Sequence, residues 1–419
     1  MPNHHDVPSF RRLRAFEAVA LANSLSGAAQ ALRLSQPALT HSVAQLEFGL
    51  GTRLFERTPE GAFLNEAGRV FHRRSERFFH QVRVALCGAN GLGMDDPAID
   101  MQASKLASAQ VRSLLAIWRS GSFRAAARAL GLTDPSLQRP ARELEQIIGA
   151  PLYRRSATGL MANEAGAELA RRLALAIGEI RAGAEELNAA PTSRASLRVG
   201  VLALAPRSLL AKAADAVLAD NGPPSIEVVE GPYSQIIRNL HDGALDVIFG
   251  ALRAPPPFDE LIEEPLFEDP YTIVCRRGHP LTHLAQAGAE DLAQFGWVHP
   301  TADLPRRAVL DQITAEWGLN QNINFETNCL ATITALLSAS DRLSILSLRH
   351  IEIDQRLERV NHPAIQHETR HVGLTIRKNW LPTPFQLRFI DHMRHLGEKF
   401  ARSQNLANFN SARNKKQES

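Results

Sequence analysis

The chain has 419 residues, of which 44% are hydrophobic and 22% are charged, and its net charge is +3. These values are ordinary for globular protein, and the length predicts two to four domains. No run of about 18 apolar residues is present, so we expect no membrane span, and the first residues lack the apolar stretch of a secretory signal. Three scattered cysteines, Cys87, Cys275 and Cys329, favour a cytoplasmic protein and argue against a disulfide framework or a cysteine metal site. We expect no metal and no cofactor.

Charge is unevenly distributed along the chain. Residues 1–90 hold 11 Lys and Arg against 7 Asp and Glu, and residues 102–188 hold 12 against 8, so each region carries +4 and the remainder is acidic. A basic first half predicts contact with a polyanion. A charged, solvated surface explains the same numbers about equally well.

The first half contains an internal repeat, the pattern to seek first in a long chain. Residues 24–68 align without a gap on residues 122–166, and 18 of the 45 positions are identical. This similarity indicates that one unit was duplicated at an offset of 98 residues. The identical pairs include Pro37 and Pro135, Glu47 and Glu145, Arg57 and Arg155, and Gly68 and Gly166.

Each unit predicts two short helices followed by a longer amphipathic helix. In the first copy, apolar residues recur at helical spacing in 13–23, and a second short helix follows from Ser24 or Ser26. Ser35 is a favourable N-cap for a third helix, whose first turn tolerates Pro37. The buried stripe of this helix is predicted to be Leu39, Val43, Leu46 and Leu50, and the outer stripe Pro37, Thr40, His41 and Ala44.

A β-hairpin is predicted directly after the third helix. Leu54 and Phe55 would anchor a first strand, and residues 59–61 would turn the chain back. Arg53 and Arg57 lie where they can reach phosphates. Two short helices, a tight turn, a third helix with a polar outer face and a hairpin together form a winged helix-turn-helix.

The stretch SLSGAAQALRLSQPALTHSVAQLEFGLGTRLFER…LNEAG resembles the DNA-binding domain of LysR-type transcriptional regulators. The similarity spans the whole unit, which makes it far more specific than a lone helix-turn-helix pattern. It implies that the third helix enters the major groove and that the wing lies along the DNA backbone. The expected DNA contacts are Gln30, Arg33, Ser35, Gln36, Pro37, Ala38, Thr40, His41, Arg53, Arg57 and Thr58.

The residue types on the outer stripe suit these roles. Gln36 can pair with adenine through two hydrogen bonds, and Pro37 can contact a thymine methyl group. Thr40 and His41 can donate to a phosphate or a base edge, whereas Arg57 supplies affinity that is sensitive to salt and blind to sequence. The alternative for each residue is an exposed side chain without a partner.

The second copy departs from the pattern at two positions. Asp134 replaces Gln36, and Pro140 replaces Ser42 inside the third helix, where a proline costs about 3 kcal/mol and favours a kink. Two hypotheses remain open: a second DNA contact, weak and non-specific or at an altered site, and a structural spacer that dimerises. The residues that support a second contact are Gln138, Arg139, Arg142, Arg154 and Arg155.

A longer helix is predicted after each copy, at 66–87 and 164–188. The second has apolar steps of 4, 4, 3, 4 and 3 residues, which approach a coiled-coil seam. The LysR resemblance implies that the helix after the wing pairs two subunits, so we expect a homodimer or homotetramer. The alternative is a helix packed on its own domain.

From residue 197 the pattern changes to alternating strands and helices, which predicts an α/β region with two lobes. The stretches GALDVIFGAL, VCRRGHPL and RHVGLTIRKNWLPTPFQLRFIDHMR resemble the effector-binding domain of LysR-type regulators, which is similar to periplasmic binding proteins. The expected fold is therefore mixed: two mainly-α winged helix-turn-helix domains with long linker helices, then the two-lobed effector domain.

Ligands of α/β sheets bind beyond the carboxyl ends of strands, near helix N-termini. Hydroxyls and helix N-termini there suit a carboxylate or a sugar, so the resemblance implies a small polar or anionic effector. Each residue can equally be a cap or a turn. The candidates chosen by position are Ala203, Pro206, Arg207, Ser208, Tyr233, Ser234, Pro300, Thr301 and Asn328.

The predicted function is DNA-binding transcriptional regulation modulated by a small-molecule effector. The alternatives are an enzyme, for which no catalytic motif is found, a small-molecule carrier, and an adaptor whose winged helices bind protein. The domain boundaries expected are 8–66 for the first winged helix, 67–88 for a linker helix, 89–103 for a flexible linker, 104–164 for the second copy, 165–190 for a second linker helix, 195–400 for the effector domain and 401–419 for a disordered tail.

Overall fold

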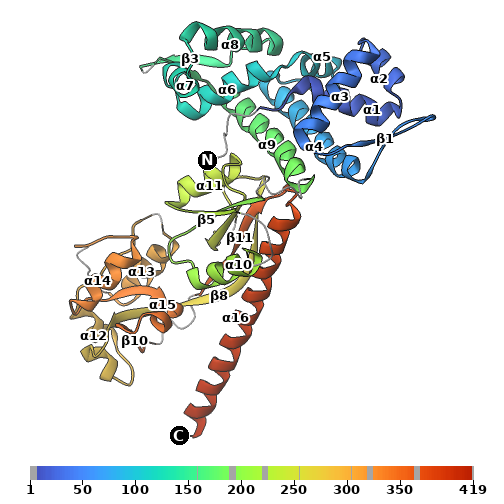
Figure 1. Cartoon of the computed structure of the whole chain (residues 1–419). Helices are drawn as coiled ribbons and strands as arrows, with labels where there is room; N and C mark the ends of the chain where they lie inside the picture. Colours follow the sequence, from blue (N-terminus) through green and yellow to red (C-terminus); the bar gives the residue numbers. More distant parts are fainter. Residues whose placement is uncertain are drawn as a thin grey trace. The chain divides into compact units, whose positions relative to one another are not determined.

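The computed structural model describes residues 7–157, 159–187, 195–218, 225–253, 255–302, 304–318, 324–362 and 369–417. The chain divides into two compact units: the first extends to residue 195 and includes 382–384, and the second holds the remainder (Figure 1). No helix in the described residues is both long enough and apolar enough to span a membrane.

The first unit contains the two winged helices in series. The elements of the first copy are α1 (Phe10–Ala22), α2 (Leu25–Ala31), α3 (Gln36–Leu50), β1 (Phe55–Thr58), β2 (Gly61–Leu64) and α4 (Glu66–Asn90). Those of the second are α6 (Ser108–Ser120), α7 (Phe123–Leu130), α8 (Asp134–Ile148), β3 (Tyr153–Ser156), β4 (Gly159–Ala162) and α9 (Glu164–Leu187), with α5 (Pro97–Lys105) between the copies.

The third helix of the first copy forms as the sequence predicts. Ser35 is its N-cap, and the side-chain oxygen of Ser35 accepts a hydrogen bond from the backbone N–H of Ala38 at 3.4 Å. Leu39, Val43 and Leu50 are buried. Because these residues share one stripe, α3 packs on α1 and leaves its opposite face outside.

Residues that are identical in the two copies hold each wing against the third helix of its copy. The Glu47 carboxylate accepts a hydrogen bond from the N–H of Leu54 at 2.7 Å, and the Glu145 carboxylate accepts one from the N–H of Leu152 at 2.8 Å. Both carboxylates therefore point inward. The repeat thus preserves a bond between the last turns of the third helix and the start of the wing.

The shared Asn and Gly residues connect the wing to the long helix that follows. Asn65 caps α4 by accepting from the N–H of Gly68 at 2.8 Å, and its amide donates to the Arg53 carbonyl at 2.9 Å. Asn163 and Gly166 repeat this cap in the second copy. A Cβ at Gly68 would lie 2.0 Å from the Leu54 carbonyl oxygen, so only glycine fits there.

Helix α8 remains a single 15-residue helix although Pro140 lies inside it, so it is as long as α3. Pro140 removes one backbone hydrogen bond, and the helix is held by its packing in the second copy. Leu137 and Ala141 are buried in the core of the second copy, and the Ser113 hydroxyl of α6 donates to the Leu137 carbonyl at 3.0 Å.

The segment between the copies differs from the expected flexible linker at 89–103, because α4 continues to Asn90 and α5 begins at Pro97. Ile99 is fully buried, and the Gln102 amide donates to the Ile148 carbonyl of the second copy at 3.2 Å. Arg14 of α1 donates to the Leu106 carbonyl at 2.6 Å. The burial of Ile99 and the hydrogen bonds to both copies therefore order this segment.

Helices α4 and α9 make the largest contact between two elements in the described residues. Their apolar residues belong to one continuous core that extends from Val7 to Ile180 and includes Phe71, Phe78 and Leu173. The sequence pattern predicts pairing between subunits or packing on one domain. The structure shows a third arrangement, in which the long helices of the two copies pair within one chain (Figure 1).

The second unit is a two-part mixed sheet with helices on it. Its elements are β5 (Ser196–Val201), α10 (Arg207–Leu218), β6 (Ser225–Glu230), α11 (Tyr233–His241), β7 (Val247–Ala251), β8 (Leu261–Arg276), the 3₁₀ helix η1 (Pro280–His283), α12 (Ala289–Ala293), α13 (Pro305–Glu316), α14 (Leu330–Ser338), β9 (Ser344–Ser347), α15 (Leu348–Ile353), β10 (Leu357–Val360), β11 (Thr369–Arg377) and α16 (Pro384–Gln417). The strand order is β10-β8-β11-β7-β5-β6, with β9 also paired to β8.

The long strand β8 joins the two lobes of this unit. Its first part pairs with β11, and its last residues pair with β9 and β10. In the first lobe β5 lies parallel to β6 and β7, so the carboxyl ends of these strands meet at one edge. This mixed two-lobed arrangement is the expected effector-domain fold.

Three segments of this unit differ from the expected elements. Residues 295–300 and 324–328, where the sequence pattern favours strands, hold only isolated bridges, at Trp297 and between His299 and Glu326. Helix α16 continues to Gln417, through residues predicted as a disordered tail. The sequence does not indicate the first part of β8, because Pro265, Pro270 and the charged residues within it break the alternation of a half-buried strand.

We predict that Gly68→Ala destabilises the first unit by about 1–3 kcal/mol, because the added methyl group overlaps the Leu54 carbonyl. Gly88→Ala, in the same helix with no atom within 4 Å of the added Cβ, is the matched control and should stabilise by about 0.5–1 kcal/mol. Urea unfolding of the full chain followed by circular dichroism measures both. Equal effects of the two substitutions would contradict the packing argument.

Candidate nucleic-acid interface and effector pocket

The outer face of α3 is exposed along its length. Gln36, Pro37, His41 and Ala44 are exposed, and Thr40 is half-buried. Phe48, one turn beyond Ala44, is 84% exposed. This face is therefore available to a partner of the first unit.

No carboxylate lies on this face. The only acidic residue of α3 is Glu47, whose carboxylate points inward to accept from the N–H groups of Leu54 and Phe55. Gln30 of α2 and Arg33 of the turn are exposed beside the start of α3, and Ser35 and Ala38 form its first turn. A neutral face edged by a cation suits an anionic partner.

The wing carries two exposed arginines, Arg53 before β1 and Arg57 within it, and an exposed threonine, Thr58. The turn from β1 to β2 is short, because Thr58 pairs directly with Gly61. The backbone N–H of Ala62 donates to the carbonyl of Asn23 at 3.0 Å, which ties the wing to the end of α1.

The turn between α2 and α3 holds a strained residue. Arg33 has φ of 53°, a left-handed conformation that costs a non-glycine residue about 1–2 kcal/mol. The equivalent position in the second copy is Gly131, with φ of 64°. The strain at Arg33 therefore points to a use for its side chain.

The second copy presents a different face. Gln138, Arg139 and Arg142 are exposed on α8 at the positions of Thr40, His41 and Ala44, and Arg154 and Arg155 are exposed on β3. Arg139 forms an exposed ion pair with Glu143 at 2.9 Å, and this lowers the pKa of Glu143. This face is more strongly charged than that of α3.

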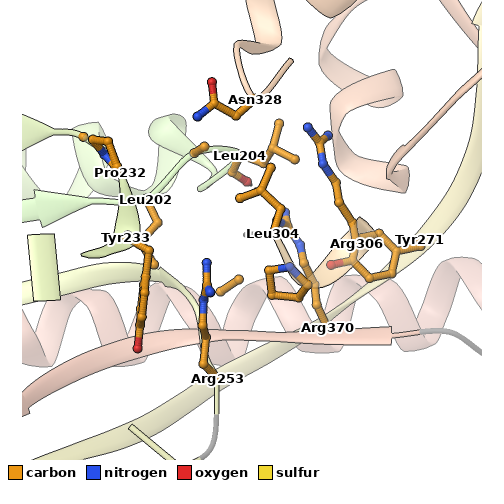
Figure 2. Close-up of a pocket in the computed structure, with 14 residues that line it drawn as sticks. Leu202, Leu204, Pro232, Tyr233, Arg253, Tyr271, Leu304, Arg306, Asn328 and Arg370 are labelled. Carbon is orange, nitrogen blue, oxygen red and sulfur yellow. The ribbon is translucent and has the colours of Figure 1, made fainter. Parts of the chain in front are cut away.

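The second unit contains a cavity at the carboxyl ends of β5 and β7 (Figure 2). Leu202, Leu204, Leu304 and Pro305 give it apolar walls. Arg253, Arg306 and Arg370 reach it from three separate segments, as Figure 2 shows. The cavity therefore combines an apolar lining with positive charge.

Arg306 is the most unusual residue of the cavity. It is 2% exposed, and no carboxylate pairs with it in the part of the chain that the structure describes. Its guanidinium donates only long hydrogen bonds, at 3.4 Å to the Ile345 carbonyl and 3.5 Å to the Thr327 carbonyl, and its Nε has no partner. Burial lowers the pKa of Arg306 to about 10, so it stays protonated at neutral pH.

The other two arginines have partners. Arg370 pairs with the buried Asp269 at 2.6 Å and donates to the Leu204 carbonyl at 2.8 Å. Arg253 lies over the ring of Tyr233, 3.8 Å from its centroid. The cavity therefore brings three guanidinium groups together, and of these Arg306 is the one that is buried without an ion pair in the described residues.

The pKa of a nearby histidine also reflects the positive charge of these arginines. His350 is half-buried, and its Nδ1 lies 2.8 Å from the Ser347 hydroxyl. Burial, together with the charges of Arg370, Arg306 and Arg207, lowers the pKa of His350 to about 3. The imidazole is therefore neutral at neutral pH.

Three of the nine effector candidates line the cavity: Ala203, Tyr233 and Asn328. Arg207 does not line it, because its guanidinium forms an exposed ion pair with Glu230 at 2.5 Å. The remaining candidates also lie outside the lining: Pro206, Ser208, Ser234, Pro300 and Thr301.

The sequence reasoning missed the arginines and Tyr271. Arg306 is the second residue of α13, and nothing in the sequence distinguishes it from the neighbouring Arg307, which pairs with Asp311 and Glu326. Arg370 lies within a strand and reaches the cavity only through the pairing of β11 with β7 and β8.

The fold and these two sites define a class of protein: winged helices with an exposed recognition helix, joined to a two-lobed ligand-binding domain. A family model described as "Bacterial regulatory helix-turn-helix protein, lysR family" matches residues 10–69 and again 108–167. A second, "LysR substrate binding domain", matches residues 191–397.

Known proteins agree with these matches. The chain is 29% identical over 394 residues to the HTH-type transcriptional regulator GalR of Pseudomonas putida, covering 90% of this chain and 95% of that protein. It is 25% identical over 239 residues to PcaQ of Agrobacterium fabrum, covering 57% and 77%. Its fold is similar to that of a full-length OxyR variant from Pseudomonas aeruginosa, with a TM-score of 0.51 and 19% identity over 68% of this chain and 94% of that one.

The chain belongs to the LysR family of transcriptional regulators. It is a DNA-binding regulator with an effector-binding domain, and its relatives are regulators rather than enzymes. The helix-turn-helix model matches twice, so the internal repeat is a duplication of the DNA-binding domain.

We predict that Arg33→Gly leaves stability unchanged or raises it by up to about 1 kcal/mol, because glycine relieves the left-handed strain but adds chain entropy. DNA affinity should fall, and the slope of log affinity against log salt should fall by about one. Arg33→Ala removes the same charge and keeps the strain, so it should weaken DNA binding without stabilising the protein. Thermal unfolding and salt-dependent anisotropy measure both effects. An unchanged salt slope would exclude a phosphate contact by Arg33.

Proposed function

We propose that α3 lies in the major groove of its operator and that the cavity of the second unit binds a small carboxylate, which alters the affinity for DNA. The observation that carries the first part is the exposed outer face of α3 without a carboxylate. The observation that carries the second is the buried and incompletely bonded Arg306.

In the first part, Gln36 is proposed to pair with a base edge, since its exposed amide is in the first turn of α3. Pro37 and Ala38 supply apolar contact, and Thr40 and His41 donate to base or phosphate. The N–H groups at the start of α3 favour a nearby phosphate. Sequence-blind affinity is assigned to the side chains around α3 and on the wing: Gln30, Arg33, Ser35, Arg53, Arg57 and Thr58.

In the second part, the chemistry of the cavity selects the ligand class. A buried, unpaired cation is unfavourable, and a carboxylate can accept two hydrogen bonds from one guanidinium. Leu202, Leu204 and Leu304 would contact a compact apolar body. The proposed effector is therefore a carboxylate on a small apolar body.

Regulation requires that the effector prefer one of two states of the protein, because a ligand with equal affinity for both shifts nothing. We assign to the chain a role as a non-enzymatic regulator in the cytoplasm, working as a homodimer or homotetramer. The adaptor alternative predicts no retardation of any duplex in gel-shift experiments.

The DNA contact is tested by selecting binding duplexes from a random library with the full chain. Gln36→Ala should lose sequence preference at the base pair it contacts and weaken binding to the selected duplex by about 5- to 150-fold, the equivalent of the 1–3 kcal/mol expected for one bidentate contact. Binding to unrelated duplex should change little. The same selected sequence and the same affinity with Gln36→Ala would remove this residue from the interface.

The ligand class is tested with matched pairs of probes: hexanoate against hexanamide, and benzoate against benzamide. The carboxylates should raise the unfolding temperature and the amides should not, because only the carboxylates offset the charge of Arg306. Arg306→Gln should weaken carboxylate binding at least tenfold, as expected for loss of a charged hydrogen bond. Arg307→Gln, its neighbour outside the cavity, should keep the carboxylate response. Equal responses to both members of a pair would reject an anionic effector.

A further inference from the structure

The two long helices of the first unit run antiparallel. Phe71 and Arg74 of α4 lie against Gly183 of α9, where an added Cβ would come within 3.1–3.2 Å of both. Further along α4, Arg77 bonds to Glu179, which comes earlier in α9, at 2.8 Å. Residues later in α4 therefore contact residues earlier in α9, which is the order expected for antiparallel helices.

Because α4 and α9 are equivalent helices of the two copies, their contact within one chain resembles the contact between two subunits of a symmetric dimer. The offset of 98 residues places α4 on α9, so the structure pairs two versions of one helix. Antiparallel contact between equivalent helices is the geometry of a two-fold interface, in which the same surface meets itself. Here the two halves belong to one chain.

The polar contacts show that this interface requires two different helices. Arg74 is fully buried, and its guanidinium bonds to Glu179 at 2.8 Å and to Glu186 at 3.0 Å. At the equivalent positions α4 itself has Gln81 and Gly88. A second copy of α4 would therefore leave the buried charge of Arg74 without a carboxylate, which is strongly unfavourable. Helix α4 thus prefers α9 to another α4.

The segment between the copies supports closure within the chain. Helix α5 packs beside α4, where Asp100 accepts from Arg83 at 2.6 Å. The Ser108 hydroxyl donates to the Pro8 carbonyl at 2.8 Å. A short, ordered connection gives the two halves a high effective concentration for each other, so pairing within a chain outcompetes pairing between chains.

We propose that one chain is a complete reader of two DNA half-sites that differ in sequence, with α3 as one recognition helix and α8 as the other. In Figure 1 the two helices lie well apart. Helix α8 is uninterrupted at Pro140 and presents Gln138, Arg139 and Arg142 where α3 presents Thr40, His41 and Ala44. Different side chains at equivalent positions read different bases. This inference rests on the proposed DNA contact of α3.

The partner is thus a duplex with two unlike half-sites, one for each helix. The outer face of α8 carries more charge than that of α3, because Arg139 and Arg142 stand where α3 has His41 and Ala44. Additional chains would have to associate outside α4 and α9, since that contact is already made within the chain.

Selection of duplexes from a random library by the full chain tests this reader. The expected product has two unlike half-sites spaced to lie on one face of the helix, about 10 base pairs or a multiple apart. Gln36→Ala should remove preference in one half-site only. Gln138→Ala with Arg142→Ala should weaken binding at least tenfold and remove preference only in the other.

Two outcomes overturn the proposal in different ways. Two identical inverted half-sites, both of which lose preference with Gln36→Ala, would mean that two chains each use α3, and the proposed DNA contact of α3 would stand. Failure to enrich any duplex would overturn the two-site reader and the DNA contact together.

Charge reversal tests whether the helices pair within one chain. Arg74→Glu with Arg77→Glu should lower the unfolding temperature by about 5 °C, and so should Glu179→Arg with Glu186→Arg. All four substitutions in one chain should recover most of the loss. A co-expressed mixture of the two double variants should show no recovery. Recovery in the mixture would mean that α4 pairs with α9 of another chain, which overturns the proposal.

Discussion

The first unit depends on one buried contact, the packing of α4 against α9 around Arg74. Burying a guanidinium is costly, and removing the partners of such a group typically costs about 3–5 kcal/mol. Glu179 and Glu186 supply those partners from the second copy, and Gly183 allows the helices to approach closely. Because this contact unites the cores of the two copies, it also fixes the orientation of α3 relative to α8.

The two copies agree at inward-facing positions and differ at exposed ones. The residues that hold the wing to its helix are unchanged: a glutamate in the third helix, an asparagine cap and a glycine under the wing carbonyl. The residues that face outward changed, as at Thr40 and Gln138 or His41 and Arg139. Selection for the fold therefore acted on inward contacts, while the exposed faces diverged.

The energetic cost of an arginine charge differs between the two units, because the arginines of the first unit are exposed and Arg306 of the second is buried. Arg57 and Arg33 are exposed, where a charge costs little and attracts phosphates over a distance set by salt. Arg306 is buried, where an incompletely bonded charge is tolerated only if a ligand or the surrounding structure offsets it. The depressed pKa of His350 follows from burial and from the positive potential that the arginines create around this cavity.

The sequence by itself determined the repeat, the cap at Ser35, the buried stripe of α3 and the two-lobed class of the second half, because caps and periodicity are local signals. It did not determine which arginine is buried, since Arg306 and Arg307 look alike until α13 packs on the sheet. It also left the linker and the partner of α4 undecided. Those depend on contacts between residues about 100 positions apart, such as Arg74 with Glu179, which only the tertiary structure brings together.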